Sequence, residues 1–139
     1  MLEENKKLFQ NIRSLNLPIG EYAIFGSGPI GIRDLRKIND IDVIVTEKIF
    51  NKYLDKPGWE IKYTYNNGHR FERLTNDDLV IEMWKDWYVN WNVKKLIKEA
   101  EIIEDMPFVK LEYLIKWKKF LSREKDLIDL ELIEDYLYD

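Results

Sequence analysis

Two aspartates at the start of an apolar strand are the residues whose spacing most clearly suggests chemistry. Asp40 and Asp42 flank Ile41 and lead into the run Val43-Ile44-Val45. Alternate residues of a strand share one face, with backbones about 6.5 Å apart, so both carboxylates project together. Neighbouring carboxylates beside apolar residues repel each other and lose hydration, and a shared divalent cation removes that conflict. Ligand sets made only of oxygen suit Mg²⁺ or Mn²⁺.

A glycine-serine turn lies upstream of the aspartate pair. Gly26-Ser27-Gly28 follows an apolar strand expected at residues 22–25, and twelve residues separate Ser27 from Asp40. Glycine lets the backbone approach a ligand, and the N-terminus of a following helix presents free N–H groups to an anion. The Ser27 hydroxyl can add a hydrogen bond to a phosphate oxygen. The turn and the carboxylates together fit an NTP carrying Mg²⁺.

The strand, the turn, the spacer and the aspartates resemble the signature of the DNA polymerase β-like nucleotidyltransferase superfamily, a strand and Gly-Ser or Gly-Gly followed by Asp-x-Asp. The resemblance implies an enzyme that transfers a nucleoside monophosphate from an NTP to an acceptor hydroxyl. It further implies that Gly26 and Ser27 bind the triphosphate, and that Asp40 and Asp42 hold the metal ions.

The superfamily also has a third acidic residue on a later strand, for which Glu82 is the candidate. It lies in Val80-Ile81-Glu82-Met83-Trp84 and would stand beside the aspartate strand if the two strands pair. A third carboxylate there would bind the metal and accept the proton of the acceptor hydroxyl. Asp77 and Asp78 are the alternatives, and a Glu82 paired with a lysine across the sheet is the competing structural interpretation.

The C-terminal segment carries a second likeness. Lys118 and the run Arg123-Glu124-Lys125-Asp126-Leu127-Ile128-Asp129 are similar to the Lys and Arg-x-Lys-Asp-x-x-Asp helices of minimal prokaryotic nucleotidyltransferases, and abortive-infection toxin nucleotidyltransferases have a related motif. The likeness implies that Lys118 or Lys125 reaches the NTP phosphates. Pairing of Lys125 with Asp129 on a helix surface explains the same residues equally well.

Other polar and aromatic residues carry weaker indications. Arg33 and Arg36 could contact phosphate, although arginines on a short exposed helix are usually solvated. The single histidine, His69, follows a hairpin glycine, where a histidine is more often a loop residue than a ligand, and it is assigned no role. A dense aromatic group could pack in the core, form a partner interface or stack an acceptor or base; it comprises Trp84, Trp87, Tyr88 and Trp91.

Hydrophobic periodicity predicts the elements that must position these groups. Strands are expected over residues 22–25, 41–45, 59–65, 69–74 and 79–84, the third with one solvent-exposed face. Helices are expected over residues 8–15, 28–35 and 47–54, and helices alone from residue 93 onward, with apolar faces that include Phe120, Leu127 and Leu137 and with Ser122 capping the last. The sequence therefore predicts an α+β (α/β) fold, a small mixed β-sheet flanked by helices.

Composition limits the functional classes. The 139 residues carry a net charge of −4, no Cys and one His, so thiolate and multi-histidine metal sites are excluded. One domain is expected over residues 1–139, with a core at about 20–90 and a helical tail at about 93–139. No apolar run approaches a membrane span and the N-terminus is too charged for a signal peptide, so a cytoplasmic protein is expected.

These observations predict a metal-dependent nucleotidyltransferase. It would use Mg²⁺ or Mn²⁺ and an NTP as co-substrate, and its acceptor would be a small molecule, a protein or a tRNA end. The net acidity disfavours nucleic acid among the acceptors. The alternative is a catalytically inactive nucleotide-binding or antitoxin-like module of the same fold that acts on a protein partner.

Overall fold

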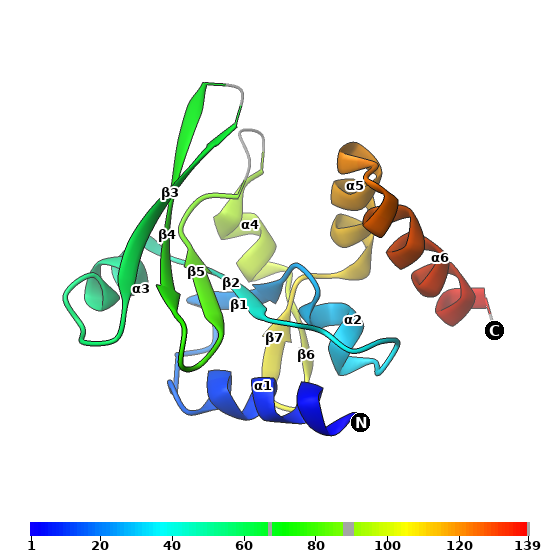
Figure 1. Cartoon of the computed structure of the whole chain (residues 1–139), viewed down its shortest axis with the longest axis horizontal. Coiled ribbons are helices and arrows are strands. Elements are labelled where there is room, and N and C mark those ends of the chain that lie inside the picture. The colour runs from blue at the N-terminus through cyan, green and yellow to red at the C-terminus, as the bar shows by residue number, and fades with distance from the viewer. Residues whose placement is uncertain (67, 88–90, 139) are drawn as a thin grey trace.

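Seven strands form one mixed sheet in the computed structural model, which describes residues 1–66, 68–87 and 91–138 (Figure 1). The strands are β1 (Tyr22–Phe25), β2 (Ile41–Val45), β3 (Glu60–Asn66), β4 (His69–Asn76), β5 (Ile81–Trp84), β6 (Glu101–Ile103) and β7 (Met106–Phe108). The helices are α1 (Glu3–Arg13), α2 (Gly28–Ile32), α3 (Glu47–Tyr53), α4 (Val93–Lys98), α5 (Leu111–Leu121) and α6 (Glu124–Tyr138). The predicted α+β class is confirmed.

The strand order places the aspartate strand at the centre of the sheet. The order is β3-β4-β5-β2-β1-β7-β6. β2 runs antiparallel to β1 and parallel to β5, so the end of β1 and the starts of β2 and β5 meet at one edge of the sheet. The β-branched sequence of β2 suits this central position, where both faces are covered.

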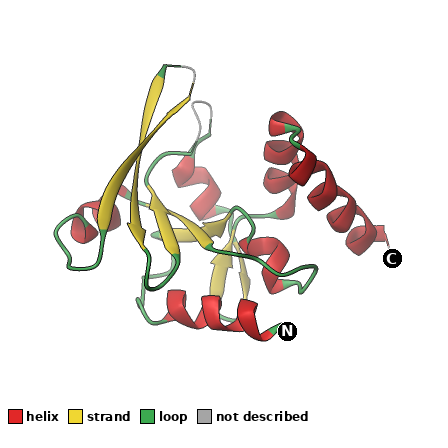
Figure 2. Cartoon of the chain, viewed as in Figure 1, coloured by secondary structure: helices red, strands yellow, loops and turns green. Residues whose placement is uncertain are grey.

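Two hydrophobic cores lie on opposite faces of the sheet. Ile41, Val43 and Val45 pack with α1 and α3 on one face, whereas Ile44 packs with α4, α5 and α6 on the other. Figure 2 shows α1 below the central strands and the α5–α6 pair above and to one side of them. Because side chains alternate along a strand, Asp42 lies on the same face as Ile44, toward the helices of the C-terminal half.

A short hairpin interrupts the segment for which helices alone were expected. β6 and β7 pair antiparallel, and β7 continues the sheet by pairing with β1 at Ile24 and Phe108. The connecting turn places Glu104 and Asp105 at positive φ. Three-residue strands are too short to show a hydrophobic period, so the prediction of helices alone beyond residue 93 is wrong over residues 101–108.

The face that α6 buries is not the apolar face that its sequence predicted. Its buried residues are Asp126, Asp129 and Ile133, whereas Leu127 and Leu137 are exposed, as is Phe120 on α5. The predicted apolar faces of these helices are therefore wrong at those three positions, because ion pairs replace apolar contacts at the start of α6.

The predicted cap of the last helix is also wrong. Ser122 ends α5 in the left-handed region and its hydroxyl donates to the Lys119 carbonyl. The Asp126 carboxylate instead accepts the Arg123 backbone N–H, 3.1 Å away, at the start of α6.

Among the described residues, no helix combines the length and the apolar character needed to cross a membrane.

A buried asparagine ties α1 to the segment that leads into β2. The Asn5 side chain accepts the Ile38 backbone N–H and donates to the Arg36 carbonyl, both at 2.9 Å. Asn5 is fully buried in α1. The hydrogen bonds to Arg36 and Ile38 therefore fix the backbone just before Asp40.

We expect Asn5→Ala to lower the free energy of unfolding by about 2 kcal/mol, because the buried Ile38 N–H and Arg36 carbonyl lose their partner. Urea unfolding followed by circular dichroism measures the loss. Gln10→Ala, an exposed change on the same helix, is the control and should have little effect. Equal stability of the two variants would contradict this account of the segment.

Candidate functional site

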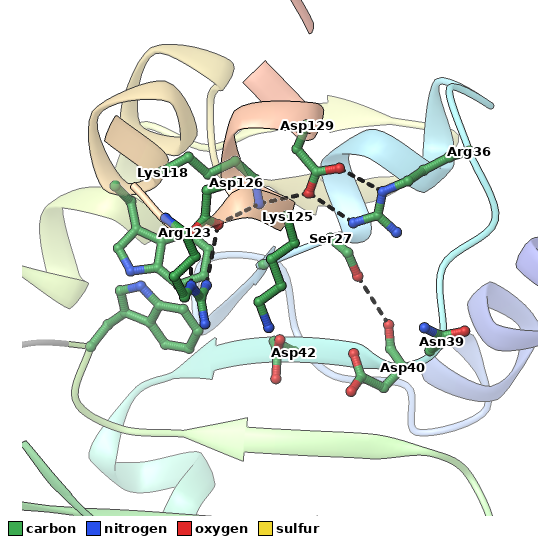
Figure 3. Close-up of a pocket in the computed structure, with 13 residues that line it drawn as sticks. Ser27, Arg36, Asn39, Asp40, Asp42, Lys118, Arg123, Lys125, Asp126 and Asp129 are labelled. Carbon is green, nitrogen blue, oxygen red and sulfur yellow. Dashed lines mark hydrogen bonds and ion pairs between the residues drawn. The ribbon is translucent and has the colours of Figure 1, made fainter. Parts of the chain in front are cut away.

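A pocket of ≈ 320 Å³ opens where the end of β1 meets the start of β2 (Figure 3). Six of the seven predicted site residues line it: Gly26, Ser27, Asp40, Asp42, Lys118 and Lys125. These residues come from three separate parts of the chain, the turn after β1, the start of β2 and the α5–α6 pair. The remaining predicted residue, Glu82, is not among those lining the pocket.

Gly26 and Asp42 are in close contact at the base of the pocket. Gly26 has φ +61, and a Cβ built on it would lie 2.5 Å from the Asp42 Oδ2 atom. Only glycine combines this backbone conformation with the space that the carboxylate needs. The Trp84 indole N–H donates to the Asp42 Oδ1 atom at 3.2 Å. The turn and the carboxylate therefore share one small volume.

The environment of the two aspartates favours their protonated forms. Burial raises the pKa of Asp42 well above its usual range, and the negative charges of Asp40 and Glu82 and a hydrogen bond with Glu82 raise it further. Burial and the charge of Glu82 also raise the pKa of Asp40, although Lys125 and Arg36 oppose this increase. Ionisation of both aspartates would thus place poorly compensated negative charge at this edge of the sheet.

Glu82 lies beside Asp42, as the sequence predicted from strand pairing. β5 pairs with β2 in parallel, with Glu82 opposite Asp42. Glu82 also forms an ion pair with Arg73 of β4, with 3.6 Å between Oε1 and Nε. Glu82 therefore has a cationic partner on the neighbouring strand, as the competing interpretation expected, but this partner is an arginine and not a lysine. Asp77 and Asp78 are exposed in the turn between β4 and β5 and do not line the pocket.

The carboxylates at this edge do not form a preorganised metal site with three protein ligands. Within the part of the chain that the structure describes, no group of three or more His, Asp or Glu side chains is arranged to hold a metal ion. Mg²⁺ is commonly bound by one or two carboxylates together with substrate phosphates, which the oxygen donors of Asp40 and Asp42 fit. Their raised pKa values are further grounds for a compensating cation at this point.

The α5–α6 pair is fixed to the pocket by ion pairs. The Lys118 ammonium contacts Asp126 at 3.5 Å and Asp129 at 2.9 Å, and all three side chains are buried. Arg36 donates two hydrogen bonds to Asp129, from Nε at 2.7 Å and from Nη2 at 2.8 Å. Arg36 thereby joins the spacer before Asp40 to α6, a contact that the sequence analysis missed. The sequence feature that pointed to this contact was the i, i+3 spacing of Asp126 and Asp129, which places both carboxylates on one face of α6.

These contacts distinguish the two lysines of the tail. Lys118 is enclosed between Asp126 and Asp129, so its charge is already compensated. Lys125 lies one residue before Asp126 and its side chain reaches into the pocket toward Asp42 (Figure 3). Asp129 pairs with Lys118 and Arg36 inside the structure, which replaces the surface pairing with Lys125 that was the alternative. Lys125 is therefore the better placed lysine for a bound anion.

The ion pairs also set the charge state of the two buried aspartates. Although burial acts to raise it, hydrogen bonds from Arg36 and Lys118 hold the pKa of Asp129 below its usual range. Burial also acts to raise the pKa of Asp126, but the hydrogen bonds from Arg123 and the charge of Lys118 outweigh it and lower that pKa. Both carboxylates therefore remain ionised where Asp42 tends to be protonated.

The aromatic group packs mainly inside the protein. Trp87 stacks on Phe25 with ring centroids 4.8 Å apart, and Trp117 of α5 contacts both rings. Trp84 lies edge-on to Trp87, and Trp91 edge-on to Phe25. Tyr88 lies outside the described residues. Trp87 and Trp117 also line the pocket, so this cluster forms an apolar wall of it.

The remaining candidates lie away from the pocket. Arg33 forms an ion pair with Glu101 of β6 and donates to the Pro29 carbonyl. His69 is the first residue of β4, and its ring packs edge-on against Phe71.

Comparisons with protein-family models, curated proteins and solved structures found no match for this chain. The geometry of the site is therefore the basis for any functional assignment.

We expect Asp42→Asn to stabilise the metal-free protein at neutral pH, because the folded state raises the pKa of Asp42. A carboxyl group whose pKa is higher in the folded than in the unfolded state stabilises the protein at a pH below its pKa in the unfolded state. This stabilisation is lost as the pH rises through its pKa in the folded state. The advantage of Asp42→Asn should therefore shrink as the pH is lowered. Chemical unfolding in the presence of a chelator, over a pH series, measures this trend, and an advantage confined to acidic pH would contradict it.

We expect Lys118→Met to lower the free energy of unfolding by about 3 kcal/mol, because two buried carboxylates lose their shared cation. Lys119→Met, an exposed change next to it on α5, should have little effect. Urea unfolding of both variants at neutral pH makes the comparison. A Lys118→Met protein as stable as Lys119→Met would show that the ion pairs do not hold α6 in place.

Proposed function

We propose that this protein is a metal-dependent nucleotidyltransferase that moves a nucleoside monophosphate from an NTP to an acceptor hydroxyl and releases pyrophosphate. The observation that carries the proposal is the contact between the Gly26 turn and the Asp42 carboxylate inside one pocket. A backbone suited to phosphate and a carboxylate in need of a cation thereby occupy the same place. The resemblance of the turn, spacer and aspartates to the polymerase β-like superfamily agrees with this arrangement.

The proposed roles follow from the positions of the side chains. Asp40 and Asp42 would hold Mg²⁺ or Mn²⁺, and the bound ion would neutralise charge between the carboxylates and the phosphates. Gly26 and Ser27 would receive the triphosphate, with the Ser27 hydroxyl donating to a phosphate oxygen. Lys125 would add positive charge from the opposite side of the pocket.

The reaction requires one proton acceptor beside the metal site. The acceptor hydroxyl oxygen would attack the α-phosphorus, and the bond from that phosphorus to the bridging oxygen of the β-phosphate would break, so that pyrophosphate leaves. Glu82, which faces Asp42 across the strand pair, would take the hydroxyl proton. To act also as the third metal ligand, Glu82 would have to leave Arg73.

A catalytically inactive module is the second candidate, favoured by two observations. Glu82 is paired with Arg73 and the carboxylates form no three-residue metal group among the described residues. Such a protein could bind a nucleotide or a protein partner without turnover. The two candidates differ in whether pyrophosphate is released.

We expect Mg²⁺ with a nonhydrolysable NTP to raise the melting temperature, because a ligand that binds only the folded state stabilises it. Each variant is compared with its own ligand-free form. Asp40→Asn and Asp42→Asn should abolish the increase, and Lys125→Ala should reduce it. Lys119→Ala, outside the pocket, should retain the full increase.

Pyrophosphate release separates the two candidate functions. Incubation with each α-labelled NTP and fractions of small molecules, RNA and protein should yield labelled acceptor and pyrophosphate if the protein is an enzyme. A Mg²⁺-dependent increase in melting temperature without label transfer would favour the inactive module. No increase with any NTP would contradict both the enzyme and a nucleotide-binding module, and would leave only a module that binds a protein partner.

A further inference from the structure

The edge strand β3 carries a row of exposed apolar side chains. Ile61, Tyr63 and Tyr65 alternate along it and are 37%, 48% and 71% exposed. β3 is the end strand of the sheet, so among the described residues no strand pairs with its outer edge. The ends of β3 and β4 next to their connecting turn also extend away from the helices, whereas α3 is drawn beside the start of β3 (Figure 1). Long apolar edge strands are unusual, because they can pair with another chain.

We propose that β3 pairs antiparallel with β3 of a second copy of this chain, with the two-fold axis at Tyr63. The strand covers Glu60–Asn66, and Tyr63 is its middle residue. Pairing about that residue uses the full length of both strands. Open backbone N–H and C=O groups along each edge would then pair with those of the other copy.

The side chains of β3 are complementary to themselves in this register. Tyr63 faces Tyr63 of the second copy, and Ile61 faces Tyr65, so aromatic and β-branched side chains meet on one face. On the other face Lys62 lies opposite Thr64. A shift that placed the axis at Lys62 would bring two lysines directly opposite each other and would shorten the overlap. The lysine pair therefore disfavours the axis at Lys62, and use of the full strand length favours the axis at Tyr63.

Other occupants fit the observations less well. Pairing of β3 with the opposite edge of the sheet would produce an open filament, and β6 at that edge has three residues. The exposed apolar residues of α6 lie among acidic residues that include Glu131 and Glu134, which would repel their equivalents in a second copy. A two-fold pairing through β3 closes after two copies.

The dimer would place both candidate sites on one side of a continuous sheet. Residues directly opposite in an antiparallel pair share a face, so the faces of the two sheets that carry Asp42 and Glu82 would be continuous. This arrangement is independent of the proposed activity, since it uses neither the pocket nor the carboxylates. Its failure and that of the nucleotidyltransferase proposal are therefore separate results.

Charge substitutions at the axis test the proposal. Sedimentation velocity over a wide concentration range should show the wild-type chain as a dimer that dissociates on dilution. Tyr63→Lys and Tyr63→Glu should each be monomeric, because each places like charges opposite one another. An equimolar mixture of the two variants should recover a dimer. Tyr138→Lys, at an exposed residue of α6, is the control and should dimerise like the wild type.

A cysteine substitution tests the register directly, because the chain has no Cys. Tyr63→Cys should form a disulfide-linked dimer under mild oxidation, since directly opposed residues lie within the distance that a disulfide spans. Leu127→Cys, exposed on α6, should remain unlinked.

Three results would overturn the proposal. They are a monomeric wild-type chain throughout the concentration range, dimerisation that survives Tyr63→Lys, and no dimer in the mixture of charged variants. Crosslinking of Leu127→Cys in place of Tyr63→Cys would likewise overturn it and would assign the contact to α6. Circular dichroism shows that each variant is folded before it is scored.

Discussion

Enclosure of the Asp42 carboxylate is the physical constraint on which the site depends. The side chain lies against Gly26, accepts the Trp84 indole N–H and stands beside Glu82 and Asp40, so its negative charge is poorly compensated. A folded protein retains such a group only where something offsets the cost, either a proton or a cation. The pocket that Asp42 lines leaves room for such a group.

The rest of the structure holds this arrangement in place. The parallel pairing of β2 and β5 brings Glu82 opposite Asp42, and Asn5 fixes the backbone before Asp40. The buried ion pairs of Lys118 attach α6 through Asp129 and Arg36 to the same segment. Attachment by charge explains why α6 presents apolar side chains to solvent. It also explains why Lys125, rather than Lys118, points toward the carboxylates.

The sequence predicted the centre of the fold better than its margins. β1 and β2 were predicted residue for residue, because continuous apolar runs bounded by turn residues specify buried strands. The β6–β7 hairpin was missed, since its three-residue strands show no period and its turn uses Glu104 and Asp105 in place of glycine. The buried face of α6 was misjudged because ion pairs, which hydrophobicity does not register, decide its orientation. The pairing of Arg36 with Asp129 depends on tertiary contact between residues far apart in the chain.

The most direct test is a crystal structure of the protein with Mn²⁺ and a nonhydrolysable NTP, with the metal located by its anomalous scattering. We expect an anomalous peak coordinated by oxygen atoms of Asp40 and Asp42, with the phosphates against the Gly26 turn and near Lys125. Nucleotide bound elsewhere, or a pocket that holds nucleotide while Asp42 contacts no metal, would contradict it.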